Sequence, residues 1–203
     1  MRWWRWIAGT TLTLALGWTG PAGAASDKVY VADEKANTVS VIDARTFTRF
    51  AIVPVGRDPH NIQVSPDGKL AWVTNNGEER KEWEQEHKGM PRREHAAMGN
   101  PGEVWAIDTA TDKVVARVQV GFHPAHVVLG PDGRFAYVTN GGESTVSVVD
   151  TLARRVVATI PVGAYPHGIR ISPDGKEAYV ANLKGLRRDL PGSVPHTLLQ
   201  PSN

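Results

Sequence analysis

Residues 166–182, PHGIRISPDGKEAYVAN, decide the fold, because the chain contains this stretch three times. The earlier copies are residues 59–75, PHNIQVSPDGKLAWVTN, and residues 124–140, PAHVVLGPDGRFAYVTN. Each copy places a Pro-Asp-Gly turn between two runs of strand-favouring residues, which predicts a β-hairpin. The turn aspartates Asp67, Asp132 and Asp174 are 65 and 42 residues apart, and the longer interval equals the shorter one plus a 23-residue insertion.

A second marker repeats with the same spacing. Asp43, Asp108 and Asp150 each close a valine-rich strand, and each precedes a glycine by 13 residues. Self-similarity with a period near 40 residues is typical of propeller blades or another repeat array. The first strands are expected at Lys28–Asp33, Asn37–Asp43, Phe50–Val55, His60–Ser65 and Lys69–Asn75.

The repeating unit is therefore four short antiparallel strands, named A to D by their place in the unit. Strand A follows the proline, and strand B ends in the Thr-Asn pair or its equivalent. Strand C ends in the marker aspartate, and strand D ends at the marker glycine. Apolar residues occur on both faces of strands B, C and D, so these strands need cover on both sides, as stacked blades provide. The spacing predicts 13 strands, with three in the first unit, four in each of the next two and two in the last.

These motifs resemble the YVTN β-propeller repeat family, also called YncE-like proteins within the WD40/YVTN repeat-like group. Residues 137–140 are the tetrapeptide YVTN itself, and residues 145–150, TVSVVD, and 159–163, TIPVG, match the family's other signatures. The resemblance covers about residues 28–183 and implies an all-β fold, a β-propeller of four-stranded antiparallel blades. It also implies a secreted protein, and relatives that are mostly non-enzymatic or uncharacterised, with haem d1-handling and quinone-associated propellers nearby.

The repeats account for an incomplete propeller, about three to four blades of an expected seven. We divide the chain into a signal peptide (1–25), propeller repeats (26–183) with an insertion at 77–101, and a non-repeat, disordered tail (184–203). A truncated or frame-shifted longer propeller and a half-propeller that closes with a second copy both fit this count. Open sheet edges would allow self-association.

The first 25 residues have the pattern of a secretory leader, with Arg2 and Arg5, an apolar stretch and the cleavage site AGA at 22–24. The apolar stretch is shorter than the roughly 20 residues of a spanning helix, so no membrane span is expected after cleavage. Without these two arginines the chain has 21 basic and 21 acidic residues, so its net charge gives no reason to expect nucleic acid binding. A periplasmic or secreted location follows. The absence of cysteine excludes disulfides and thiolate chemistry.

The insertion contains two His-x-x-Met pairs, His87 with Met90 and His95 with Met98. Imidazole and thioether groups together suit copper, Cu(I) above all. The four residues are a candidate copper site, and the alternative is an exposed loop in which they have no function.

Topology places a second candidate site on one face. Strands alternate in direction, so the insertion and the D–A connections emerge on the same side of the blades. Residues of these connections form the candidate ligand-binding face: Asp58, His60, His123, His126, Tyr165 and His167. His60 and His167 are at equivalent positions of strand A and should line the channel mouth, whereas His126 is one place later. The alternative for each histidine is a turn residue that bonds a backbone carbonyl.

Three functions remain open from the sequence. The first is a non-enzymatic scaffold that binds a small ligand or a protein through the loop-bearing face. The second is a periplasmic protein that handles a metal, with copper ahead of a haem-type cofactor. The third, an enzyme such as a lactonase or oxidoreductase, rests on fold analogy alone. We find no catalytic motif in the sequence, and we interpret Asp67, Asp132 and Asp174 as turn residues.

Overall fold

The computed structural model describes residues 27–77 and 101–184. A short 3₁₀ helix, η1 (Glu34–Ala36), separates the first two strands and was not expected from the sequence. The strands are β1 (Lys28–Asp33), β2 (Thr38–Asp43), β3 (Arg49–Pro54), β4 (Pro59–Val64), β5 (Leu70–Asn75), β6 (Glu103–Asp108), β7 (Lys113–Gln119), β8 (Pro124–Leu129), β9 (Phe135–Asn140), β10 (Thr145–Asp150), β11 (Arg155–Pro161), β12 (Pro166–Ile171) and β13 (Ala178–Asn182). The expected strands match these within a residue or two.

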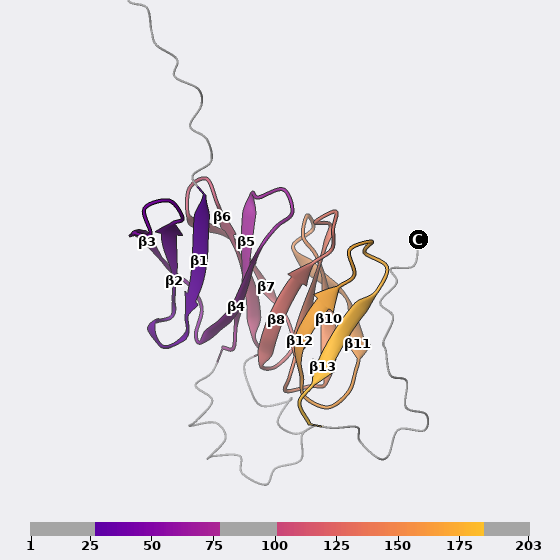
Figure 1. The fold of residues 1–203 in the computed structure, drawn as a ribbon. Coiled ribbons are helices and arrows are strands. Elements are labelled where there is room, and N and C mark those ends of the chain that lie inside the picture. Colours follow the sequence, from indigo (N-terminus) through magenta and orange to yellow (C-terminus); the bar gives the residue numbers. More distant parts are fainter. Residues whose placement is uncertain (1–26, 78–100, 185–203) are drawn as a thin grey trace, which may run out of the picture.

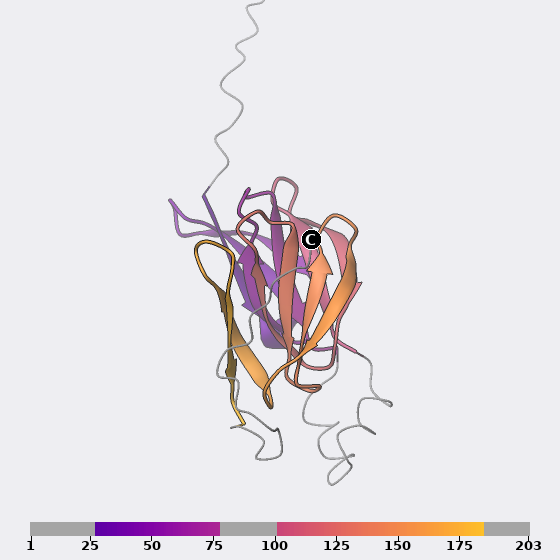
Figure 2. The same cartoon turned by 90° about the vertical axis from the view of Figure 1, so that its right-hand side faces the viewer.

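The strands form four antiparallel sheets, in the orders β1-β2-β3, β4-β5-β6-β7, β8-β9-β10-β11 and β12-β13. In the described residues the sheets contain three, four, four and two strands, as the repeat spacing predicts. Figures 1 and 2 show the sheets standing side by side, with the axes of their strands roughly aligned. The all-β prediction of four-stranded antiparallel blades is confirmed.

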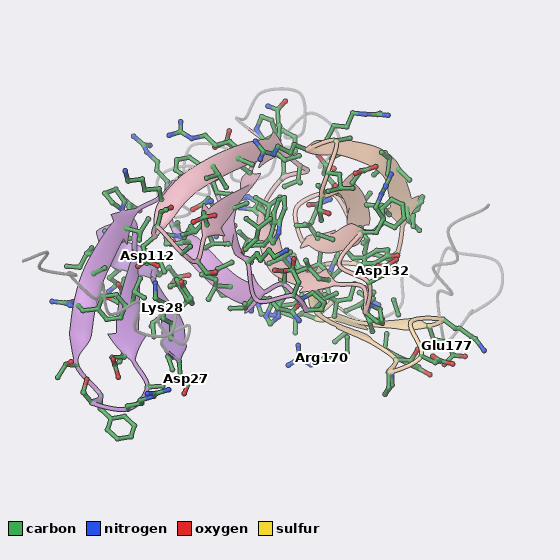
Figure 3. All side chains as sticks on the ribbon, turned by 90° about the horizontal axis from the view of Figure 1, so that it is seen from above. Asp27, Lys28, Asp112, Asp132, Arg170 and Glu177 are labelled. Carbon is green, nitrogen blue, oxygen red and sulfur yellow. The ribbon has the colours of Figure 1, made fainter. Side chains whose placement is uncertain are left out.

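The sheets follow one another in an arc when the molecule is viewed along the strands (Figure 3). β8 packs against β4 on one side and against β12 on the other. These three strands are the A strands of successive blades, so strand A is innermost, as expected. Strands β4, β8 and β12 therefore line the concave side of the arc, where Figure 3 also places Arg170.

Apolar cores fill the spaces between neighbouring sheets. Trp72 and Val104 of the second sheet pack with Val127 and Val138 of the third, and all four side chains are buried. Similar clusters join the first sheet to the second and the third to the fourth. Each blade thus supplies the cover that its neighbour needs, which is the physical reason for repetition.

The expected burial of strand D is wrong for β3 and β11. Phe50 and Ile52 on β3 are 49% and 52% exposed, and Val157 on β11 is 42% exposed. Both strands lie at the edges of their sheets, farthest from the inner strands. In the second and third sheets, cover from the neighbouring blades reaches strands B and C but leaves much of strand D in solvent. In the two outer sheets strand B is also partly exposed, at Val29 and Val31 of β1 and at Tyr179 of β13.

The glycine that closes strand D has a steric function. A Cβ atom on Gly121 would lie 2.6 Å from Cγ of Asn140, which is closer than atoms can approach. Gly56 meets Asn75 and Gly163 meets Asn182 in the same way. The glycine marker of one blade and the asparagine that ends strand B of the next blade therefore pack together, and this contact repeats at three junctions between blades.

The threonine before that asparagine joins neighbouring blades. The Thr74 hydroxyl accepts a hydrogen bond from the backbone N–H of Asn61 (3.0 Å) and donates one to the carbonyl of Ala125 in the next blade (2.9 Å). The Thr139 hydroxyl likewise accepts from the N–H of His126 (3.0 Å) and donates to the carbonyl of His167 (2.7 Å). One hydroxyl therefore fixes the register between two inner strands.

The repeated aspartates act in turns. Asp150 accepts hydrogen bonds from the N–H groups of Leu152 and Ala153, and these bonds, with Arg134, hold its pKa below the usual value. Asp174 accepts hydrogen bonds from the Ser172 hydroxyl and the Lys176 N–H, which lower its pKa in the same sense. These contacts confirm that Asp174 is a turn residue.

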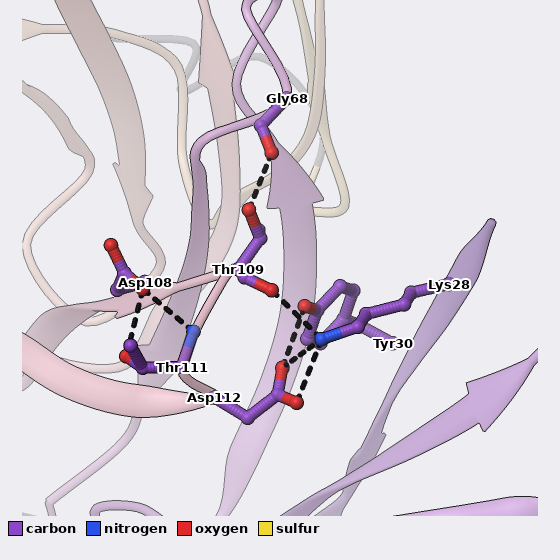
Figure 4. Close-up of polar contacts among 7 residues, drawn as sticks. All are labelled: Lys28, Tyr30, Gly68, Asp108, Thr109, Thr111 and Asp112. Carbon is purple, nitrogen blue, oxygen red and sulfur yellow. Dashed lines mark hydrogen bonds and ion pairs between the residues drawn. The ribbon is translucent and has the colours of Figure 1, made fainter. Parts of the chain in front are cut away.

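An ion pair joins the first blade to the second at the end of the strands opposite the histidines (Figure 4). Lys28 Nζ lies 2.8 Å from Asp112 Oδ2 and donates to the carbonyl of Thr109 at 2.8 Å. Tyr30 donates its hydroxyl to Asp112, and burial together with this carboxylate raises the pKa of Tyr30. Both side chains of the ion pair are mostly buried, so this contact is shielded from salt.

Within residues 27–77 and 101–184, no helix has the length and apolar character needed to cross a bilayer.

We expect Thr139→Val to destabilise the protein by about 2 kcal/mol, because the near-isosteric change leaves a buried N–H and a buried carbonyl without their shared partner. Urea unfolding of the full chain would measure the change. Thr159→Val, at an exposed position of β11, is the matched control and should have little effect. Equal unfolding midpoints for the two variants would show that the hydroxyl bridge contributes little to stability.

Candidate functional site

The three inner strands share a local irregularity that carries the histidines. The pairing of β4 with β5 shifts between Pro59 and Ile62, and the pairings of β8 with β9 and β12 with β13 shift between Pro124 and Val127 and between Pro166 and Ile169. His60, His126 and His167 lie in these intervals. An irregularity of this kind changes the direction of the side chains within it.

The three imidazoles meet on the concave side of the arc. Their ligating nitrogens all lie within 4.8 Å of one another. His60 Nε2 and His167 Nε2 are 3.2 Å apart, and the ring centroid of His126 lies 5.9 Å and 4.9 Å from those of His60 and His167. We call these residues the histidine cluster. Three successive blades thus contribute one ring each.

The histidine cluster includes the residue that is out of register. The N–H of His126 bonds to Thr139 as the N–H of Asn61 bonds to Thr74, so His126 is equivalent to Asn61 and not to His60. The sequence shows this offset of one place. The structure adds that the offset brings the ring of the middle strand close to the other two rings.

Glu34 supports the cluster from the first blade. Its Oε1 lies 3.0 Å from Nδ1 of His60, and η1 packs against β4. A carboxylate at this position favours the tautomer in which Nδ1 carries the hydrogen. The Nε2 lone pair of a neutral His60 then faces His167.

The environment of His126 favours its neutral form. Burial lowers the pKa of His126 to about 4, with further contributions from nearby His167, His60 and Arg170. Adding a proton to the central ring would place a charge in a partly desolvated site near the Arg170 guanidinium. His126 is therefore a neutral imidazole at pH 7.

A groove of about 420 Å³ adjoins the histidine cluster along the inner strands. Its size is within the roughly 300–1,000 Å³ range of small-molecule sites. Polar side chains from two strands reach it, namely Asn61, Gln63 and Arg170, beside apolar residues of β8. The groove thus offers amide groups and one guanidinium next to three imidazoles.

The other predicted residues of this face lie in turns. Asp58, His123 and Tyr165 occupy one repeat position before the proline of strand A, with left-handed φ values of 50°, 49° and 58°. Asp58 accepts a hydrogen bond from the Asn76 side chain, and the Tyr165 ring contacts Lys184. These three residues shape the connections and are outside the histidine cluster. The predicted copper ligands, His87, Met90, His95 and Met98, lie outside the described residues.

Sequence reasoning missed Glu34, Gln63 and Arg170. Gln63 and Arg170 occupy matching positions of strand A, four residues after Pro59 and Pro166. This equal spacing from the proline could have shown that both side chains lie at the same level of neighbouring inner strands. Glu34 belongs to a connection between strands B and C of another blade, and nothing in the repeat pattern pairs it with His60.

Comparisons with known proteins agree on the propeller class. A model of the cytochrome D1 haem domain matches residues 97–185. Antigen Lp49 of Leptospira interrogans is 28% identical over 119 residues, which is 59% of this chain and 24% of that protein. Hydrazine synthase from Kuenenia stuttgartiensis aligns with a TM-score of 0.62 and 23% identity over 78% of this chain and 40% of that one. The chain thus spans a quarter to two fifths of these two proteins.

Acidification should destabilise the protein through His126. Its pKa is about 4 in the folded state and about 6.5 in the unfolded state, so between these values only the unfolded chain takes the proton. The contribution of His126 to the free energy of unfolding is fully present above pH 6.5 and is lost as the pH falls toward 4. We expect the free energy of unfolding to fall by roughly 1–2 kcal/mol between pH 7 and pH 5. Urea unfolding in a chelating buffer at both pH values would measure it. His126→Gln should lose less stability on acidification; an unchanged pH dependence in this variant would contradict the assignment.

Proposed function

We propose that this chain belongs to a non-enzymatic binding propeller of the YVTN-repeat type, which holds a small ligand at the histidine cluster and its groove. The observation that carries the proposal is the meeting of side chains from β4, β8 and β12 at one place. Three separate blades converge there, and packing alone does not require three imidazoles at a half-open position. Amide, guanidinium and imidazole groups beside an apolar wall form a site that can orient a polar small molecule.

A binding function is favoured over an enzymatic one by what the acidic residues do. Asp67, Asp150 and Asp174 hold turns through hydrogen bonds to backbone or hydroxyl groups. Their lowered pKa values make them poor general acids. The secretory pattern of residues 1–25 supports a periplasmic or secreted location for this binding protein.

Affinity selection with mass spectrometry tests the proposal. The protein without its leader is incubated with a metabolite library in chelating buffer, and retained compounds are identified after separation from unbound material. We expect at least one retained compound, anionic because Arg170 lines the groove, whose binding falls at least about tenfold in Arg170→Ala. Arg155→Ala, an exposed arginine on the outer strand β11, is the matched control. Compounds retained equally by both variants, or none retained by the wild type, would contradict this function.

A haem-type cofactor is the second candidate, because the cytochrome D1 haem domain model covers a range that includes His126 and His167. A single imidazole of the cluster is a suitable axial ligand for haem iron. The spacing disfavours a flat macrocycle between the rings, since the ring centroids are only 4.9–5.9 Å apart. A macrocycle would have to lie against one side of the cluster, so the donor set fits a single ion better.

Titration with haem separates the two candidates. If the second is correct, the wild type should give a Soret band at one equivalent, and His126→Gln with His167→Gln should abolish it. His123→Asn, a change that a left-handed turn position tolerates, should leave it intact. A Soret band that persists when His60, His126 and His167 are all replaced by glutamine would remove the cofactor from this site.

A further inference from the structure

We propose that His60, His126 and His167 bind one divalent transition-metal ion, Zn²⁺ or Cu²⁺, through three imidazole nitrogens. The inference rests on the proposed function to the extent that it names the ligand class of the same site. It differs from the copper prediction for the insertion, which concerns other residues. Three features of the cluster support this site: the distances between the rings, the hydrogen that His60 carries, and the space beside the rings.

The distances suit a small ion. Metal–nitrogen bonds to Zn²⁺ are about 2.0–2.1 Å, so two ligands of a tetrahedral site lie about 3.3 Å apart. His60 Nε2 and His167 Nε2 are 3.2 Å apart, which is already that separation. The third nitrogen lies within 4.8 Å of both, so it would have to move closer to complete a three-nitrogen set. Imidazole nitrogen is a common ligand of both Zn²⁺ and Cu²⁺.

Glu34 gives His60 the tautomer that a metal ligand needs. With the hydrogen on Nδ1 directed to Glu34 Oε1, His60 Nε2 carries its lone pair toward the cluster. Metal-bound histidines commonly have such a carboxylate on their second nitrogen. With this assignment, His167 Nε2–H is the donor to His60 Nε2. A metal ion bound by both Nε2 atoms would require His167 in its other tautomer.

The charges around the cluster are of both signs. His126 faces His60, His167 and the guanidinium of Arg170, and the Glu34 carboxylate lies on His60. A bound cation would be repelled by Arg170, and an anion held by Arg170 beside the cluster would offset that repulsion.

The cluster leaves an open coordination position. Three protein ligands with a fourth position for water or another ligand are typical of functional zinc sites, whereas structural sites are closed by four. Asn61 and Val127 of the groove are the chain neighbours of His60 and His126, so the groove begins beside the ligands. An anionic ligand in the groove could bind the ion and Arg170 together. The His60 side chain is 31% exposed, which leaves a route for the metal.

Metal titration in the presence of a competing chelator tests the inference with Zn²⁺ and with Cu²⁺ alone. The background is the full chain without its leader, with His87, Met90, His95 and Met98 replaced by alanine, so the insertion does not contribute. We expect one equivalent of tightly bound metal. His60→Gln, His126→Gln and His167→Gln should each lower the affinity by more than about 100-fold, because even changes outside the ligand shell cost 10–100-fold.

Two further variants give the test its controls. Glu34→Gln should weaken binding by about tenfold, which a direct ligand would exceed. His123→Asn, in the turn before Pro124, should leave the affinity unchanged. Electron paramagnetic resonance of the Cu²⁺ complex reports the ligands directly: hyperfine coupling to three imidazole nitrogens in the parent protein and to two in each single-histidine variant.

The outcomes separate this inference from the proposed function. Affinity no higher in the parent protein than in His126→Gln, or unchanged nitrogen coupling, would overturn the metal site. If Arg170-dependent retention of a compound persists in chelating buffer, the binding function then stands without the metal. If neither histidine-dependent metal binding nor Arg170-dependent retention of a compound is observed, both proposals are overturned.

Discussion

The threonine hydroxyl that bridges two inner strands is the contact on which the arrangement depends. Thr74 and Thr139 each hold an N–H of their own blade and a carbonyl of the next. Apolar cores between sheets supply most of the stabilisation, but apolar packing is not directional and would tolerate sliding. A buried hydroxyl that accepts a hydrogen bond from one strand and donates one to the next does not tolerate sliding. A shift of one residue would leave the N–H and the carbonyl without their partner. The repeat therefore uses valine for cohesion and threonine for register.

This register is what turns three separate histidines into a cluster. Thr139 bonds the backbone of His126 and of His167, so it fixes two of the three histidines at their main-chain atoms. Two further amides act in the same direction, since Asn61 and Gln63 accept hydrogen bonds from the N–H groups of Val127 and Leu129. The positions of the rings are consequences of backbone contacts between blades. They would not survive if the blades moved independently.

Much of the fold could be predicted from the sequence because the residues that determine each strand and turn lie within one repeat or its neighbour. Pro-Asp-Gly turns, valine-rich strands and the glycine paired with asparagine all act within one blade or between neighbours, so their spacing predicts the strands directly. Parity and topology also placed His60 and His167 on one face. The contribution of Glu34 could not be predicted, because its partner is 26 residues away in another blade and depends on a single turn of 3₁₀ helix. The burial of strand D was overestimated, since pattern alone does not distinguish an edge strand from a central one.

The polar groups at the two ends of the blades are arranged differently. At one end, Lys28 and Asp112 neutralise each other in a mostly buried pair, with Tyr30 and Thr109 completing their hydrogen bonds. At the other end, three basic groups gather with one carboxylate, and that carboxylate reaches only the outermost ring. The first arrangement is complete in itself and needs no further component. The second places three imidazoles and a guanidinium beside a groove, and our proposal is that a cation and an anion complete this arrangement.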